Sequence, residues 1–383
     1  MKRFSYAVAL SLPLLAACGG GGSTSEQLPQ QQPVTAPLGS LSESQSDAQS
    51  EAIRKSSSGA ADLLYVGNTG SNSITVYNHA AQGNTAPLYV ISGPNTGINA
   101  PGQLSEDAQG NLYVANGDWQ LPSTNPAILV FAHGANGNVA PIRKLAGPLT
   151  GINNVNAMTV DQGTGKMFVV DSAPGTNGRI VDVRLLRFPP KSSGNVAPFA
   201  RSTPDLDPAY QLASDSTGQN VIEAHFSSTP SVAGFGTATI AKQFANNTHP
   251  SFPYSIGFMY ALGVADDPTT KTYLVASGAY GIYRLAENTV GYGPLEGPEN
   301  LKPTPVSIIT SDTCGTQLAV APGPTPYTYV THSRTLFANG GGGCPADAVY
   351  VYANRAAGNA SPLRILSGSA TGLSAPYGIY EGK

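Results

Sequence analysis

The sequence predicts an all-β fold of six repeats that close into a six-bladed β-propeller, and three observations lead to this prediction. The 383-residue chain has 44 glycines and 31 prolines but only 11% charged residues, which indicates many turns between short strands. Two sequence phrases recur at spacings suited to a four-stranded blade of about 40–50 residues. The two ends of the repeat region each lack a strand that the other end supplies.

The first phrase is Gly-Asn-x-Ala/Ser-Pro, set between two expected strands. It occurs at 83–87, 137–141, 194–198 and 358–362, and degenerate copies lie at 245–250 and 291–294. The second phrase is a short strand that ends in Val followed by two more residues. Its six copies span 63–68, 111–116, 167–172, 221–226, 273–278 and 328–333. Six copies of each phrase predict six blades.

The second repeat shows how the strands are expected to divide a blade. Residues 102–107 form the inner strand, 111–116 the second, 127–132 the third and 141–146 the outer strand. The turn between the first two is made by residues 108–110, where glycine supplies the backbone freedom that a tight turn needs.

The ends of the repeat region predict how the ring closes. The region begins at Leu63 with a second strand and has no inner strand before it. It ends at 377–381, which has the pattern of an inner strand with no second strand after it. Pairing of these two strands would complete one blade and remove exposed sheet edges. We therefore expect closure by the N- and C-terminal strands.

Residues 1–17 have the pattern of a signal peptide. Lys2 and Arg3 precede an apolar stretch at 4–15, which is too short to span a bilayer, and Leu-Ala-Ala then leads into Cys18. This arrangement resembles the lipobox of bacterial lipoproteins. The resemblance implies that Cys18 carries the lipid and, because glycine follows it, that the protein is sorted to the outer membrane.

Residues 18–60 are expected to be a flexible tether between the lipid and the propeller at 61–383. The tether is rich in Gly, Ser, Gln and Pro and has few bulky apolar residues. Such a segment buries too little surface to offset the entropy of ordering it. The sequence thus predicts a disordered spacer that holds the folded domain away from the bilayer.

Several repeat residues match a known propeller pattern. They are Pro101-Gly102 and 376–379 at inner strands, together with 110–116 and 128–131. In these residues the chain resembles NHL-repeat propellers and the related gluconolactonase-like six-bladed propellers, most sharply in its first two repeats and its last. The resemblance implies a fold and not a function. Gluconolactonase-like enzymes hold a divalent metal with carboxylates and amides in the channel, and their motif residues do not map cleanly onto this chain.

Only two cysteines follow Cys18, namely Cys314 and Cys344. An even pair in an oxidising compartment is typical of a disulfide. We expect a Cys314–Cys344 bridge that would hold the glycine-rich loop at 334–347, worth about 3–4 kcal/mol through loop entropy.

A polar residue is expected near the end of each second strand, close to the channel mouth. The six are Asn68, Asn116, Asp171, His225, Ser277 and His332. One interpretation is a functional ring in which Asp171, His225 and His332 bind one divalent metal. The other is that each side chain caps the turn that follows it, as Asn, Asp and Ser commonly do.

Long loops are expected at 117–126, 172–183, 226–237 and 334–347, and the single tryptophan, Trp119, lies in the first. An exposed aromatic side chain there could contact a sugar or a protein partner, or it could hold its own loop. There is no nucleophile elbow, phosphate-binding loop or dinucleotide fingerprint, and Lys2-Arg3 is the only basic cluster. Nucleic acid is therefore not an expected partner.

These observations favour a monomeric, lipid-anchored propeller of the cell envelope that binds a protein or glycan and needs no cofactor. The alternative is a metal-dependent lactonase- or lyase-like hydrolase that uses Asp171, His225 and His332 at the channel mouth.

Overall fold

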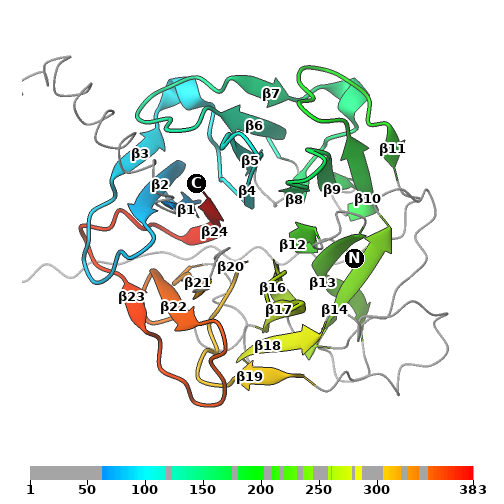
Figure 1. The fold of residues 1–383 in the computed structure, drawn as a ribbon. Helices are drawn as coiled ribbons and strands as arrows, with labels where there is room; N and C mark the ends of the chain where they lie inside the picture. Colours follow the sequence, from blue (N-terminus) through cyan, green and yellow to red (C-terminus); the bar gives the residue numbers. More distant parts are fainter. Residues whose placement is uncertain are drawn as a thin grey trace, which may run out of the picture. The chain divides into compact units, whose positions relative to one another are not determined.

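The computed structural model describes residues 63–117, 123–174, 180–201, 209–214, 220–230, 236–244, 258–259, 261–277, 281–286, 305–320, 327–335 and 344–382. These residues form an all-β propeller, which confirms the predicted fold class. Their 24 strands make six four-stranded sheets arranged around a centre (Figure 1). Within this part of the chain, no helix has the length and hydropathy needed to cross a membrane.

We number the sheets in chain order and describe each from its inner to its outer strand. The first contains β24 (Pro376–Gly382), β1 (Leu63–Asn68), β2 (Ser73–Asn78) and β3 (Tyr89–Ser92). The second contains β4 (Leu104–Glu106), β5 (Leu112–Asn116), β6 (Ala127–Phe131) and β7 (Arg143–Leu145). The third contains β8 (Val155–Val160), β9 (Met167–Pro174), β10 (Ile180–Phe188) and β11 (Ala200–Arg201).

The fourth sheet contains β12 (Ala209–Ser214), β13 (Asn220–Pro230), β14 (Gly236–Phe244) and β15 (Phe258–Met259). The fifth contains β16 (Ala261–Asp267), β17 (Thr272–Ser277), β18 (Gly281–Ala286) and β19 (Ser307–Ile309). The sixth contains β20 (Leu318–Val320), β21 (Tyr327–His332), β22 (Ala348–Ala353) and β23 (Arg364–Leu366). Two short 3-10 helices, η1 (Pro94–Thr96) and η2 (Pro148–Thr150), follow the outer strands of the first and second sheets.

The strand assignments in the second sheet are close to those expected, but two expected loops are largely strand. Strand β9 continues to Pro174 and strand β10 begins at Ile180, so the two strands cover much of 172–183. Strand β13 continues to Pro230 and strand β14 begins at Gly236, so the expected loop at 226–237 is shortened in the same way. The sequence pattern missed these extensions because their residues lack the alternation of apolar and polar side chains.

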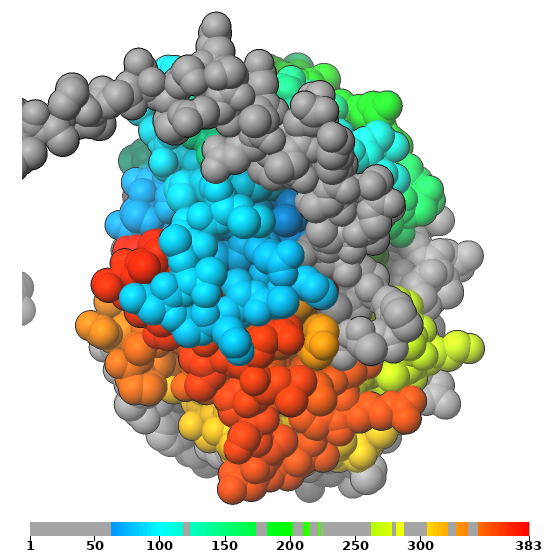
Figure 2. All heavy atoms as spheres, turned by 60° about the vertical axis from the view of Figure 1, so that its left-hand side comes forward, coloured from blue at the N-terminus to red at the C-terminus, as the bar shows by residue number. Residues whose placement is uncertain are grey.

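The first sheet combines strands from both ends of the described chain. Strand β1 pairs antiparallel with β24, with Leu63 opposite Gly382 and Tyr65 opposite Tyr380. The space-filling view shows the blue and red segments side by side on one face of the molecule (Figure 2). The inner strand of this sheet therefore comes from the C-terminal end of the chain.

Alternate side chains of each second strand enter different hydrophobic cores, because each sheet is covered by a neighbouring sheet on both faces. In β5, Leu112 and Val114 pack into the core shared with the first sheet. Tyr113 and Ala115 pack into the core shared with the third sheet. This explains why the middle strands read as continuous apolar runs. Full burial of one large aliphatic or aromatic side chain stabilises the fold by about 1.5–3 kcal/mol.

The Gly-Asn phrase connects neighbouring sheets. Gly137 lies in the hairpin loop between β6 and β7, and it exchanges two backbone hydrogen bonds with the outer strand of the preceding sheet, at Val90 and Ser92. The same exchange links Gly194 to β7, Gly358 to β19 and Gly83 to β23. The last of these joins the first sheet to the sixth. We call these four contacts the Gly-Asn clasps.

The asparagine of the phrase completes three of the clasps. Asn138 Oδ1 accepts a hydrogen bond of 2.8 Å from the Asn95 amide in η1. A side chain at Gly93, which precedes η1, would bring a Cβ within 2.5 Å of that same oxygen. Gly93 also has a φ of 116°, which only glycine adopts readily. The glycine before η1 is thus required by an asparagine 45 residues further along the chain, and Gly147 before η2 is placed against Asn195 in the same way.

Glutamines close the centre of the ring. Gln103 Oε1 accepts from the amides of Met158 and Leu212, and Gln103 Nε2 donates to the Leu212 carbonyl at 2.5 Å. These partners belong to the third and fourth sheets. The inner strands of three sheets are therefore joined across the centre by one side chain.

Gln211 repeats this arrangement between the fourth, fifth and sixth sheets. Its Oε1 accepts from the amides of Val264 and Leu318, and its Nε2 donates to the Leu318 carbonyl at 2.7 Å. Gln317 occupies the equivalent position in the sixth sheet and differs from the other two. It donates to the Tyr210 carbonyl at 2.8 Å, and its Oε1 has no hydrogen-bond partner among the described residues.

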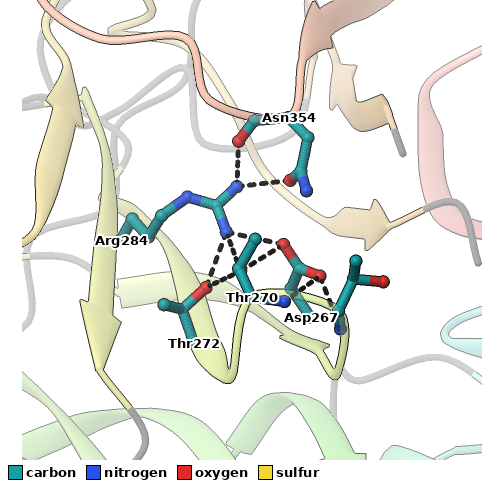
Figure 3. A network of polar contacts seen from close by, with 6 residues as sticks. Asp267, Thr270, Thr272, Arg284 and Asn354 are labelled. Carbon is teal, nitrogen blue, oxygen red and sulfur yellow. Dashed lines mark hydrogen bonds and ion pairs between the residues drawn. The ribbon is translucent and has the colours of Figure 1, made fainter. Parts of the chain in front are cut away.

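A buried arginine joins the fifth and sixth sheets (Figure 3). Arg284 Nη1 lies 2.7 Å from Asp267 Oδ2 and 2.6 Å from Thr272 Oγ1, and Nη2 lies 2.5 Å from Asn354 Oδ1. Burial opposes ionisation of Asp267, but hydrogen bonds from Thr270 and Arg284 outweigh it and hold the pKa of that carboxyl below its ordinary value. The ion pair thus adds a charged contact to the apolar core between these sheets.

The central glutamines predict unequal costs for equal substitutions. Gln211→Leu should lower the free energy of unfolding by roughly 3–9 kcal/mol, because three buried backbone groups lose their partners at about 1–3 kcal/mol each. Gln317→Leu should cost only about 1–3 kcal/mol, because one such group loses its partner. Urea denaturation of both variants measures the difference. Equal destabilisation would contradict the distinct roles assigned to the two glutamines.

Candidate functional site

The polar ring expected at the channel mouth is buried. The exposed fractions of Asn68, Asn116, Asp171, Ser277 and His332 lie between 0% and 3%. His225 lies within β13, and its side chain is outside the described residues. Asp171 and His225 also do not end their strands, because β9 and β13 continue to Pro174 and Pro230.

Two asparagines of the ring hold the loop that leads into the inner strand of their own sheet. Asn68 Oδ1 accepts from the Ser374 amide at 3.0 Å, just before β24. Asn116 Oδ1 accepts from the Asn99 amide at 2.7 Å, before β4. Through these oxygens both side chains anchor the loop that precedes the inner strand of their own sheet.

Asp171 holds the equivalent loop of the third sheet with a carboxylate. Its Oδ1 accepts from the amides of Asn153 and Asn154 at 2.8 Å each, and its Oδ2 accepts from Asn153 Nδ2 at 3.0 Å. Burial raises the pKa of Asp171 to about 6, although the three N–H donors favour the ionised form. A carboxyl that titrates near neutrality is the type of group that acid–base catalysis uses. Here all its described partners belong to the loop that it anchors.

In the sixth sheet two residues share this task. His332 Nε2 lies 3.0 Å from Asp312 Oδ2, and the Gly315 amide donates to Asp312 Oδ1 at 3.0 Å, just before β20. Burial opposes ionisation of Asp312, but the hydrogen bonds from His332 and the Cys314 amide hold the pKa of that carboxyl below its ordinary value. The His332 ring also stacks on Tyr350, with ring centres 3.9 Å apart.

The structure does not bring the expected metal ligands together. Asp171 belongs to the third sheet and His332 to the sixth, and each is bonded to its own loop. In the described ranges, no three His, Cys, Asp or Glu side chains are grouped as a metal site would require. Ser277, the fifth member of the ring, lies at the end of β17 opposite Ala261.

The expected Cys314–Cys344 disulfide is absent, and both cysteines are free in the structure. They are nonetheless neighbours, because Cys344 Sγ donates to the Cys314 carbonyl oxygen at 3.2 Å. The Cys344 thiol therefore contacts Cys314 without a covalent bond between the two residues. Burial and the adjacent Cys314 raise the pKa of the Cys344 thiol, so it stays protonated near neutral pH.

The loops at 117–126 and 334–347 each have their two ends joined by a hydrogen bond. Asn116 Nδ2 donates to the Asn125 carbonyl at 3.1 Å, which joins the two ends of the loop at 117–126. The Arg334 amide donates to Asp347 Oδ1 at 2.8 Å and closes the loop at 334–347 in the same way. Trp119 and residues 336–343 lie outside the described residues. The ring residues Asn116 and His332 directly precede these two loops.

Sequence reasoning missed the glutamines that close the centre and the aspartate that partners His332. A signal for the glutamines was present, because Gln-Leu recurs at 103–104, 211–212 and 317–318 in alternate repeats. No comparable signal marks Asp312. It is one of several acidic residues near turns, and only the fold places it against His332.

Comparisons with known proteins add little to this geometry. No protein-family model matches the chain. No curated protein matches it either. Among solved structures, hydrazine synthase of Kuenenia stuttgartiensis is similar over 70% of this chain and 72% of that one, with 11% sequence identity and a TM-score of 0.43.

The buried carboxylate predicts a pH effect on stability. Folding raises the pKa of Asp171 from 3.8 to about 6, so the folded state holds the proton more tightly than the unfolded state. The free energy of unfolding should therefore fall as pH rises from about 4 to about 6, by roughly 2–3 kcal/mol from this group. Asp171→Asn should remove that decline while keeping an acceptor for the loop, as Asn68 and Asn116 do. Urea denaturation between pH 4 and pH 7 tests this, and a profile parallel to that of the natural chain would contradict it.

The buried pair of His332 and Asp312 predicts that substitution of His332 lowers the free energy of unfolding and leaves the metal content of the protein unchanged. His332→Ala should lower the free energy of unfolding by about 3–5 kcal/mol, because it leaves a buried carboxylate unpaired. His332→Gln should restore most of this, since its amide can donate to Asp312. Elemental analysis of protein prepared without chelator is the second measurement. Near one equivalent of divalent metal that is lost in the folded His332→Gln variant would instead support the metal-dependent hydrolase.

Proposed function

We propose that this chain is a binding module that contacts a protein or glycan ligand through the loops at 117–126 and 334–347. The propeller fold supports a binding or interaction role. The observation that carries the proposal is that both loops start beside buried ring residues and have their ends joined by hydrogen bonds, Asn116 to Asn125 and Arg334 to Asp347. Loops held at their bases by a rigid scaffold are the usual carriers of recognition.

The contacts below these loops favour binding over chemistry. The central glutamines join inner strands, and three ring side chains, Asn68, Asn116 and Asp171, anchor backbone loops. These groups are buried and already bonded within the protein, which supports a binding role over a catalytic one. Trp119 lies in the first loop, and a tryptophan supplies more contact area to a partner than any other side chain.

We further propose that the six sheets are the blades of a ring closed by β1 and β24, and that the ring is tethered to the cell envelope. The pairing of Leu63 with Gly382 and the clasp between Gly83 and β23 support closure. The sequence around Cys18 supports a lipid anchor, with 18–60 as the spacer and the outer membrane as its location. In this arrangement the binding loops belong to a domain that stays near a membrane.

Cross-linking in envelope extracts, with the full chain as bait, tests the binding role. Trp119→Ala should reduce recovery of the specific cross-linked partner by roughly 30-fold, the size of a binding hot spot. Trp119→Phe should keep most of it. His133→Ala is the matched control, because His133 is exposed on the hairpin loop at the other end of the same sheet. Unchanged recovery with Trp119→Ala and with residues 336–343 replaced by a Gly/Ser segment would reject the proposed loops.

A further inference from the structure

Exposed apolar side chains gather on the outer margin of the second and third sheets. Nine large apolar side chains of the described residues are strongly exposed, and five of them belong to these two sheets. The five are Val139, Ile142, Leu149, Val196 and Phe199, with exposed fractions from 36% to 61%. An apolar cluster on the surface of a soluble domain usually marks a contact site.

Hydrogen bonds between the two sheets make this cluster one continuous surface. The Gly194 amide donates to the Lys144 carbonyl at 2.7 Å, which places the hairpin that carries Val196 beside β7. Asn195 Oδ1 accepts from the Leu149 amide at 2.8 Å. Arg201 lies beside Gly151, which follows η2, because a Cβ added at this glycine would be 3.9 Å from Arg201 Nη2. Strands β7 and β11 are the outer strands of two neighbouring sheets (Figure 1).

The described residues of this surface carry positive charge and no carboxylate. Its segments at 127–160 and 183–201 contain no Asp or Glu, although the chain has a net charge of −3. Lys144, Lys191 and Arg201 are exposed around the apolar side chains. Lys144 Nζ donates to the neutral Asn125 side chain, so its charge is not compensated there. Arg143 precedes Lys144 in the sequence, but Lys191 and Arg201 are far from this pair along the chain, so the sequence does not mark the three exposed cations as one group.

We propose that this surface, defined by Ile142, Lys144, Leu149, Lys191, Val196, Phe199 and Arg201, docks on an anionic phospholipid bilayer. Exposed apolar side chains ringed by lysine and arginine are the combination that binds the interface of a negatively charged membrane. The charge complementarity favours lipid over an apolar protein groove, which would leave the three cations without counter-charges. Docking places the margin of the ring against the membrane.

The proposal does not depend on the lipid at Cys18 or on the loops assigned to ligand binding. A lipid anchor and a docking surface would act together, since two membrane signals bind far more firmly than one. The docked surface lies on the outer strands of the second and third sheets, whereas the proposed binding loops leave from the ring around the centre. The two sites can therefore be tested separately.

Fluorescence depth measurements on the full chain test the proposal directly. The chain has one tryptophan, so Phe199→Trp in a Trp119→Phe background creates a single reporter within the surface. In vesicles of phosphatidylcholine with phosphatidylglycerol, brominated acyl chains should quench this reporter and its emission should shift to the blue. Leu88→Trp in the same background is the matched control. Leu88 also follows a proline and precedes an outer strand, it is 52% exposed, and residues 79–103 around it contain no Lys, Arg, Asp or Glu.

Charge reversal tests the electrostatic part. Lys144→Glu with Arg201→Glu should weaken binding to phosphatidylglycerol vesicles roughly 30-fold, given the usual contribution of each basic residue near a membrane. Lys271→Glu with Arg355→Glu is the control, since both residues are exposed elsewhere on the ring. Equal quenching of the reporters at 199 and 88, absence of quenching at 199, or equal weakening by the two double variants would each overturn the proposal. None of these outcomes bears on recovery of a cross-linked partner at Trp119.

Discussion

The backbone exchange between each Gly-Asn turn and the outer strand of the preceding sheet is the interaction on which the rest of this structure depends. A four-stranded sheet with two apolar faces is stable only when a neighbour covers each face. The clasp at Gly137 fixes the position of the second sheet against the first, because Gly137 makes two backbone hydrogen bonds to Val90 and Ser92. Side chains of β5 can then divide between two cores. The clasp also uses backbone groups at the outer edge that would otherwise invite pairing with another chain.

The centre of the ring and its polar positions follow from the same need to fix neighbouring strands. Gln103 and Gln211 bind backbone groups of inner strands that approach one another too closely for larger side chains to fit between them. Asn68, Asn116, Asp171 and His332 hold the segments that deliver each inner strand to the centre. Polar residues near a channel are therefore insufficient evidence of catalysis here, because a buried side chain that anchors a loop has the same residue type and the same spacing. The ligand-binding and membrane-docking roles that we propose are assigned to other parts of the chain: the loops at 117–126 and 334–347 and the outer margin of the second and third sheets.

Particular residues show where sequence reasoning succeeded and where it failed. The spacing of the Gly-Asn phrase indicated the propeller, because a clasp needs the same glycine and asparagine in every blade that makes it. The strands of the second sheet were close to expectation for the same reason. The long strands β9 and β13 were missed, since nothing local distinguishes their outer residues from loop. The disulfide expected from the even number of cysteines is not present in the structure, although Cys314 and Cys344 are neighbours.

The sequence by itself determined that this protein is a repeat of short strands, where its blades begin and which turns connect them. Those features depend on contacts that recur with the repeat, so each is written several times in the chain. Only the tertiary structure decided that Gln103 reaches Leu212, that His332 meets Asp312, and that Lys144, Lys191 and Arg201 share one surface. Such contacts join residues that are tens to hundreds of positions apart and occur once. Their partners are set by how the sheets pack against one another, and no local pattern of residue types records them.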